Sequence, residues 1–148
     1  DLQTLNLNDF DALAIPGGFE PAGFYQEALS DAFLEVIRFF HQQKKIIASV
    51  CVSSLALGRA GILQNRQATI YHQQHGQRKQ QLQQTGAVFF DRPLVCDEYC
   101  ITSTGPGTAI EVAFTLLEKL TDRDNALQVR EKMRVPTPSP EWYQTPQV

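Results

Sequence analysis

The stretch Ile46-Ile47-Ala48-Ser49-Val50-Cys51-Val52-Ser53-Ser54-Leu55-Ala56-Leu57-Gly58 decides the fold expected for this chain. Residues 46–49 are apolar or small, which indicates a strand covered on both faces. The residues after them predict a sharp corner at Cys51 and then a helix. Ser49 and Ser53 stand two positions before and after Cys51. This is the small-x-nucleophile-x-small spacing of a nucleophile elbow, where bulky neighbours would clash.

A cysteine at such a corner lies over the N-terminus of the following helix. The free N–H groups and the partial positive charge there favour a thiolate, so Cys51 is the candidate nucleophile. The alternative is an inert buried thiol, because free cysteine is among the most buried residue types. The residues around the corner leave both interpretations open.

The composition is that of a soluble globular protein with one domain. Its 148 residues are enough for a core, and 43% are hydrophobic while 20% are charged. The net charge of −3 gives no overall attraction to nucleic acid or to an anionic membrane. No apolar run reaches the roughly 18 residues of a membrane span. We therefore expect neither a nucleic-acid partner nor a membrane partner.

Three cysteines without a framework spacing favour free thiols and a reducing compartment. The residues Asp1-Leu2-Gln3-Thr4 lack the basic and apolar regions of a signal peptide, so the sequence predicts a cytoplasmic location. Cys96 and Cys100 flank an expected hairpin turn at 97–98. Plain packing of these two thiols is favoured there over a cross-strand disulfide.

Apolar runs alternate with amphipathic segments along the chain, which indicates an α/β three-layer fold. Residues 11–15 predict a strand that leads to Gly17-Gly18, where no Cβ covers the backbone N–H groups. Ser30 is a candidate N-cap for a helix over 30–43. Further strands are expected over residues 68–71, 87–90, 94–96 and 99–102.

The glutamine-rich segment 72–86 is predicted to be either a polar loop or a short exposed helix. His72 and His75 have the spacing of metal ligands on a helix, but a third ligand is not apparent nearby. The sequence therefore predicts neither a metal nor a cofactor. Thr108 and Glu111 form a candidate capping box for a helix over 109–120. Its expected buried stripe contains Ile110, Ala113, Phe114, Leu117 and Leu120.

A short helix over about 122–133, with Thr121 as its cap, completes a predicted single domain over residues 1–135. The proline-rich segment 136–148 is expected to be an extended tail. Trp142 and Tyr143 are candidates to pin this tail to the body or to a partner, and a flexible end is the alternative.

Three loops are expected at one edge of the sheet, because parallel α/β folds form sites at the C-terminal ends of their strands. These loops contain Gly17-Gly18, Cys51 and Gly105-Pro106-Gly107. Their convergence on a single thiol favours a functional Cys51 over an inert one.

The chain resembles the ThiJ/PfpI family, which includes deglycase-like proteins. Order and spacing agree over roughly residues 9–132. The resemblance implies a three-layer α/β/α sandwich with a mostly parallel sheet, flavodoxin-like and of the class I glutamine amidotransferase type. The matching pieces are 11–18 (DALAIPGG), 47–51 (IASVC), 61–63 with 68–69, and 101–111 (ITSTGPGTAIE).

The resemblance implies that Cys51 is the elbow nucleophile, that the N–H groups of Gly18 and Val52 form an oxyanion site, and that the protein is a homodimer. It implies an enzyme for small carbonyl compounds or their adducts, a glyoxalase- or deglycase-like hydrolase or lyase. The alternatives are a non-catalytic redox sensor or stress-response protein that uses the same thiol, and an amidase- or peptidase-like hydrolase.

Several positions depart from the family pattern. The usual first strand–helix–strand unit, which carries a glutamate beside the cysteine in the deglycase-like branch, has no counterpart before Asp9. Val52 replaces the histidine that follows the cysteine in the protease-like branch, and Glu20 is the nearest substitute for the glutamate of that branch. Tyr71 occupies the place of a family histidine and His72 is displaced from it by one. Glu20, Tyr71 and His72 are therefore further candidates for the site.

Overall fold

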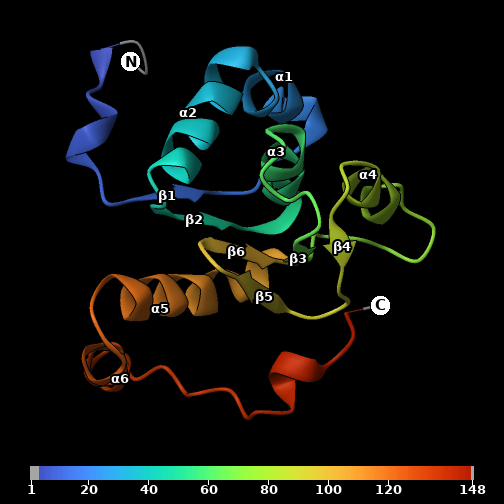
Figure 1. Cartoon of the computed structure of the whole chain (residues 1–148). Coiled ribbons are helices and arrows are strands. Elements are labelled where there is room, and N and C mark those ends of the chain that lie inside the picture. Colours follow the sequence, from blue (N-terminus) through green and yellow to red (C-terminus); the bar gives the residue numbers. More distant parts are fainter. Residues whose placement is uncertain (1–3, 148) are drawn as a thin grey trace.

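The computed structural model describes residues 4–147 and has a central sheet between two sets of helices (Figure 1). The strand order is β1-β2-β6-β5. The strands β1, β2 and β6 are parallel, and β5 pairs antiparallel with β6. The expected mostly parallel sheet within an α/β/α sandwich is thereby confirmed. The bounds are Ala12–Ile15 for β1, Ile46–Ser49 for β2, Leu94–Asp97 for β5 and Cys100–Ser103 for β6.

The strands expected over 68–71 and 87–90 are shorter than predicted. They form a separate two-stranded parallel sheet of β3 (Gln67–Ala68) and β4 (Val88–Phe89). The chain leaves β3 early because it turns toward the corner at Cys51, where the Tyr71 N–H donates to the Cys51 carbonyl at 3.2 Å. This segment is thereby placed beside the elbow rather than in a longer strand.

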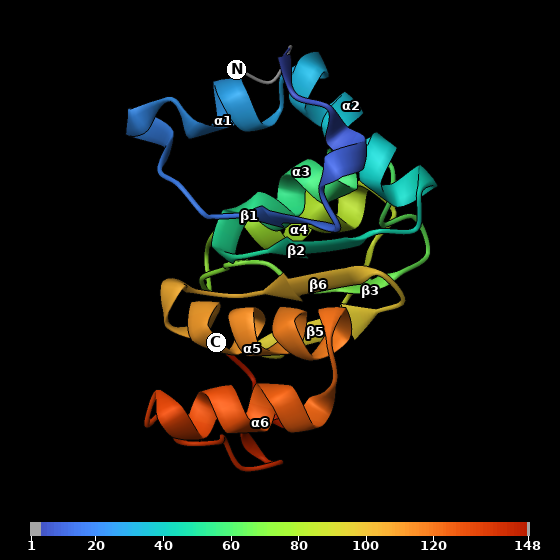
Figure 2. The ribbon, with the colours of Figure 1, turned by 90° about the vertical axis from the view of Figure 1, so that its left-hand side faces the viewer.

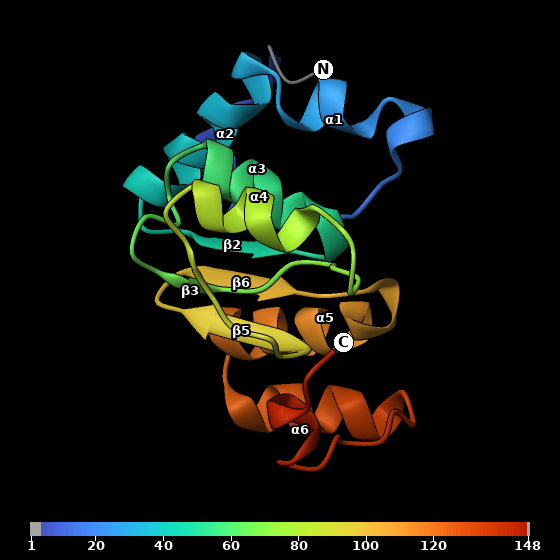
Figure 3. The same cartoon turned by 90° about the vertical axis from the view of Figure 1, so that its right-hand side faces the viewer.

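Helices cover both faces of the sheet. Figures 2 and 3 show α1 to α4 on one side and α5 with α6 on the other. The α-helices are α1 (Phe24–Ala28), α2 (Asp31–Gln42), α3 (Ser54–Arg59), α4 (Arg78–Gln84), α5 (Ala109–Leu120) and α6 (Arg123–Lys132). Short 3₁₀ turns are η2 (Leu7–Asp9), η3 (Glu20–Ala22), η4 (Cys51–Ser53), η5 (Pro106–Thr108) and η6 (Trp142–Gln144). The glutamine-rich segment is thus a loop followed by the short helix α4. No helix within residues 4–147 has the length and apolar character required to cross a membrane.

The helix α2 forms as its sequence predicts. The Ser30 hydroxyl caps it by accepting from the Phe33 N–H at 3.4 Å. Its buried face, which includes Ile37 and Phe40, packs in the same core as Ile47 of β2. Each such fully buried side chain contributes about 1.5–3 kcal/mol to the free energy of folding. This core fixes the strand that leads into Cys51.

The capping box predicted for α5 is wrong. The Thr108 hydroxyl does not cap the helix but donates to the Gly105 carbonyl at 2.8 Å. The Glu111 carboxylate turns away from the helix start and binds both terminal nitrogens of Arg130 in α6, at 2.8 and 2.7 Å. The carboxylate thus joins two helices instead of closing one.

The buried stripe predicted for α5 is also wrong in large part. Phe114 is buried, but Ile110 and Leu120 are exposed. The helix is rotated from the expected setting because α6 packs on the side that carries Glu111. Val112, which the predicted stripe left out, packs in the core with Ala48 and Ile101 of the sheet.

The proline-rich tail packs against the body of the protein. The Tyr143 hydroxyl donates to Glu111 at 3.0 Å, and the Gln147 N–H donates to Asp91 at 2.8 Å. Trp142 and Tyr143 lie in η6, so the segment is not extended throughout. The cap of α6 is Asp122, whose side chain accepts from the Asn125 N–H, rather than the predicted Thr121.

Candidate active site

Cys51 occupies a strained corner directly after β2. Its φ angle is +64°, in the left-handed region that residues with a Cβ seldom adopt. Val50 before it is extended, and Cys51 begins η4. The Ser53 hydroxyl accepts from the Val50 N–H at 3.0 Å and lies within donating distance, 3.0 Å, of the Ile15 carbonyl. The small residue two positions after the cysteine therefore braces the corner.

The Gly17-Gly18 loop packs directly on this corner. A Cβ on Gly17 would lie 2.8 Å from the Cys51 Cβ, and a Cβ on Gly18 would lie 2.2 Å from the Phe24 ring. Both positions therefore require glycine for close approach. Within residues 4–147 the Gly18 N–H has no hydrogen-bond acceptor, so it is available to a ligand.

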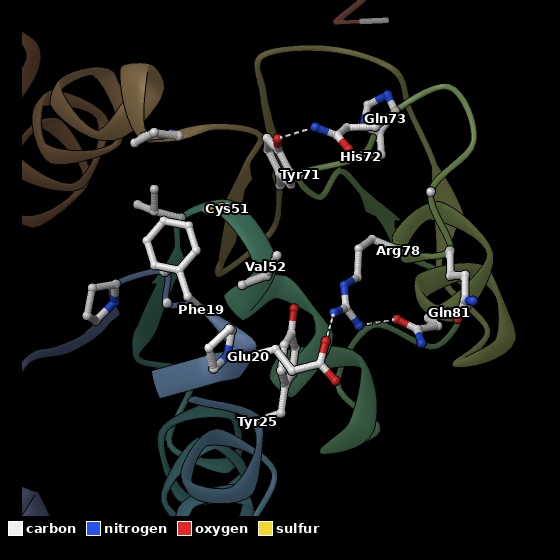
Figure 4. Close-up of a pocket in the computed structure, with 18 of the residues that line it drawn as sticks. Phe19, Glu20, Tyr25, Cys51, Val52, Tyr71, His72, Gln73, Arg78 and Gln81 are labelled. Atoms are coloured by element: carbon white, nitrogen blue, oxygen red, sulfur yellow. Dashed lines mark hydrogen bonds and ion pairs between the residues drawn. The ribbon is translucent and has the colours of Figure 1, made fainter. Parts of the chain in front are cut away.

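The loops that follow β1, β2 and β6 line one open cleft of about 1100 Å³, and Gly17, Gly18, Cys51, Val52 and Pro106 belong to its wall. The sequence predicted this meeting of three loops at one sheet edge. Figure 4 shows Cys51 and Val52 between Tyr71 on one side and Glu20 with Tyr25 on the other. Cys51 is partly exposed in the cleft, whereas Cys100 in β6 is buried. All three cysteines are free.

The acidity of the Cys51 thiol differs from the sequence expectation. Burial raises its pKa above the ordinary value for a thiol, and a hydrogen bond from the Val52 N–H opposes that rise only in part. The helix α3 that follows is short, at six residues, so it offers little compensating charge. The resting form of Cys51 at neutral pH is therefore the thiol.

Tyr71 and His72 take different roles. Tyr71 lines the cleft, and its hydroxyl accepts from the Gln73 side chain at 2.8 Å. His72 is buried, with Nδ1 2.7 Å from the Ile70 carbonyl and Nε2 3.1 Å from Asp91. A carbonyl only accepts, so Nδ1 carries the hydrogen. Both ring nitrogens of His72 thus face other partners than Cys51.

His72 and His75 do not combine into a metal site. No group of three or more histidine, cysteine, aspartate or glutamate side chains among the described residues 4–147 is placed to hold a metal ion.

Glu20 lies at the mouth of the cleft in an ion pair with Arg78 of α4, at 3.2 Å between Oε2 and Nη2. The Arg78 guanidinium also lies 4.3 Å from the centroid of the Tyr25 ring and donates to Gln81 at 2.8 Å. Burial raises the pKa of Tyr25, and the Arg78 charge opposes this. Sequence reasoning missed Tyr25 and Arg78. The sequence signal for Arg78 was a positive charge within a glutamine-rich segment. This signal did not indicate a site residue, because only the position of α4 beside the cleft brings Arg78 into it.

Comparisons with known proteins agree with this geometry. A sequence model of the DJ-1/PfpI family matches residues 1–119. The chain is 32% identical over 130 residues to the glutathione-independent glyoxalase DJ-1 of Schizosaccharomyces pombe, which covers 86% of this chain and 63% of that protein. It is also 32% identical over 120 residues to the isonitrile hydratase of Pseudomonas putida, which covers 81% of this chain and 50% of that protein.

The fold is likewise similar to that of solved structures. The crystal structure of Drosophila melanogaster DJ-1beta superposes with a TM-score of 0.75 at 28% identity, over 88% of this chain and 68% of that one. The chain spans about a quarter to two thirds of the length of the curated relatives it matches. The family model and the relatives agree, and the chain belongs to the DJ-1/PfpI family.

Proposed function

We propose that this protein is a cysteine-dependent enzyme of glyoxalase or deglycase type, which acts on small carbonyl compounds or their adducts. The observation that carries the proposal is the left-handed φ angle of Cys51 in the wall of an open cleft that Gly18 and Val52 also line. The name of the glyoxalase relative supports the substrate class. A homodimer in a reducing compartment, with no bound cofactor, completes the proposal.

The first step forms a bond between the Cys51 sulfur and the carbonyl carbon of the substrate. Because burial keeps the Cys51 pKa high, the thiol proton leaves as this bond forms and ends on the former carbonyl oxygen. The product is a neutral hemithioacetal. The N–H groups of Gly18 and Val52 would stabilise the charge that develops on that oxygen before the proton arrives.

For a 2-oxoaldehyde, the remaining steps need only a proton shift and water. The carbon-bound proton of the hemithioacetal moves to the oxygen of the adjacent carbonyl group, which gives an enediol. The proton of the other enediol hydroxyl, on the carbon that bears sulfur, then moves to the adjacent carbon, which leaves an alcohol there and a thioester on Cys51. Water then cleaves the thioester to a 2-hydroxy acid and restores the thiol. One carbon is oxidised and its neighbour is reduced, so an external oxidant is not required.

Turnover of methylglyoxal tests this function. We expect activity in the wild-type protein, no activity in Cys51→Ala, and wild-type activity in Cys96→Ala, which removes an exposed thiol outside the cleft. Methylglyoxal consumption that continues at the wild-type rate in Cys51→Ala would overturn the mechanism. The amidase- or peptidase-like alternative predicts instead that Cys51 is needed for release of an amine from an amide substrate.

The redox-sensor alternative uses the same accessible sulfur. It predicts that mild peroxide adds oxygen to Cys51 before Cys96 or Cys100. Burial raises the pKa of Cys96, and it raises the pKa of Cys100 to about 11. Peptide mass spectrometry after a short exposure to peroxide measures this order. Rapid, selective oxidation of Cys51 in a protein that does not consume methylglyoxal would favour the sensor over the enzyme.

A further inference from the structure

The cleft contains a single pair of opposite charges. Among the described residues that line it, Arg78 is the only arginine or lysine and Glu20 is the only carboxylate. Arg78 comes from α4 and Cys51 from the corner after β2, and Figure 4 shows the two residues apart, with Val52 between them. A ligand that touched both residues would therefore need several bonds between its two recognised ends.

Two contacts fix the position of the Arg78 guanidinium. The ring of Tyr25 lies under it at 4.3 Å, and Gln81 one turn along α4 accepts from Nη1 at 2.8 Å. The side chain of Arg78 is 26% exposed. A guanidinium fixed by a ring and a hydrogen bond loses little rotational freedom when it binds a planar anion.

Glu20 holds the remaining face of Arg78 only loosely. Its side chain is 75% exposed, so solvent screens the ion pair strongly. The pair nevertheless shows that a carboxylate fits against Arg78 from the cleft side. A carboxylate that enters with a ligand can thus displace Glu20 at small cost and bind the same donors.

We propose that Arg78 is a specificity-determining residue that binds the carboxylate of an elongated carbonyl compound while the carbonyl group of that compound lies at Cys51. Glu20 pairs with Arg78 and competes with the ligand for it. Tyr25 positions the guanidinium. This inference rests on the proposed carbonyl chemistry at Cys51 and adds the substrate class, which is a carbonyl compound with a remote carboxylate.

A pair of alkylating probes tests the inference without any turnover. N-iodoacetyl-4-aminobutanoate and its carboxamide share one reactive carbon and differ only in the remote charge. Each forms a sulfur–carbon bond with Cys51, with release of iodide and of the thiol proton to solvent. Peptide mass spectrometry gives the rate at Cys51 for each probe, and the ratio of the two rates reports on the carboxylate.

Four variants separate the outcomes. We expect Arg78→Gln to lower the ratio of anionic to neutral rate by about threefold or more, as suits a partly exposed ion pair. Arg78→Lys keeps the positive charge but loses the paired donors of the planar guanidinium, so it should give an intermediate ratio of the two alkylation rates. Glu20→Gln should raise the ratio because the competitor is gone. Lys79→Gln is the matched control, since Lys79 lies over the Phe89 ring and does not line the cleft.

Equal ratios in Arg78→Gln and Lys79→Gln would overturn the inference, as would a Glu20→Gln ratio at or below that of the wild type. If Arg78→Gln does not fold, Arg78→Lys and Glu20→Gln decide the question. Failure of the proposed function would appear separately, as methylglyoxal turnover that survives Cys51→Ala. The alkylation ratio does not depend on that turnover.

Discussion

The backbone of Gly17 packs against the side chain of Cys51 in the wall of the cleft. A β-carbon on Gly17 would lie 2.8 Å from the Cys51 Cβ and 3.4 Å from its sulfur. Real β-carbons essentially never approach another atom as closely as the shorter distance. The loop after β1 and the corner after β2 therefore fit together only when the first of these residues has no side chain.

Substitution of Gly17 by alanine should disturb the site more than the fold. We expect Gly17→Ala to lower the free energy of unfolding by about 1–3 kcal/mol through overpacking, and to change the alkylation rate of Cys51. Urea unfolding and iodoacetamide labelling measure the two effects. Gly107→Ala is the control in the same cleft region, because a Cβ there meets no atom within 4 Å. Equal effects of the two substitutions would contradict the contact.

The pH dependence of Cys51 alkylation should reflect the raised pKa of its thiol. Because burial disfavours the thiolate, the labelling rate should climb with pH and reach its midpoint above that of an exposed cysteine in a peptide. Initial rates with iodoacetamide between pH 7 and pH 10 check this. A midpoint below that of the peptide would mean that the elbow stabilises the thiolate, as the sequence pattern alone suggested.

Loss of the Glu111 charge should destabilise the contact between α5 and α6. The carboxylate binds Arg130 at 2.8 and 2.7 Å, and both side chains are nearly inaccessible to solvent. We expect Glu111→Gln to cost about 3–5 kcal/mol, because it leaves a buried guanidinium without its counter-charge. Glu118→Gln, at an exposed position of the same helix, should cost about 0.5 kcal/mol or less. Similar urea midpoints for both variants would argue against the buried pair.

The link between Tyr143 and Glu111 should weaken at high pH. Burial, with the Glu111 carboxylate beside it, raises the pKa of Tyr143 to about 12, above the ordinary value of 10.0. The folded protein thus favours the protonated phenol. The stabilisation is complete below pH 10 and is lost as pH rises through about 12. The difference in unfolding free energy between wild type and Tyr143→Phe should therefore shrink over this range. A constant difference would show that the hydrogen bond does not form.

The elements that the sequence predicted well are those with a local cause. The strand at Ile46–Ser49, the cap at Ser30 and the corner at Cys51 depend on residues within a few positions of one another. The meeting of the glycine loops at Cys51 followed from one topological rule for parallel sheets. The alternation of strands and helices predicted the three-layer arrangement, and the family resemblance added that the sheet is flavodoxin-like.

The features that sequence reasoning missed depend on partners distant in the chain. Glu111 followed Thr108 at capping-box spacing, but Arg130 offered it a stronger partner from another helix. Arg78 stood in a segment without periodicity, so only its approach to Glu20, 58 residues away, gave it a place in the cleft. The raised pKa of Cys51 comes from the partial burial of the corner, which spacing in the sequence does not report.

The anchoring of the tail has a spectroscopic consequence. Trp142 is the only tryptophan in the chain, and its indole lies edge-on to the Tyr143 ring at 4.9 Å, in the segment that Glu111 holds. Tryptophan fluorescence therefore reports on the structure around η6, while far-UV circular dichroism reports on the sheet and the helices. Detachment of the tail before the body unfolds would separate the two melting curves, with no label added to the protein.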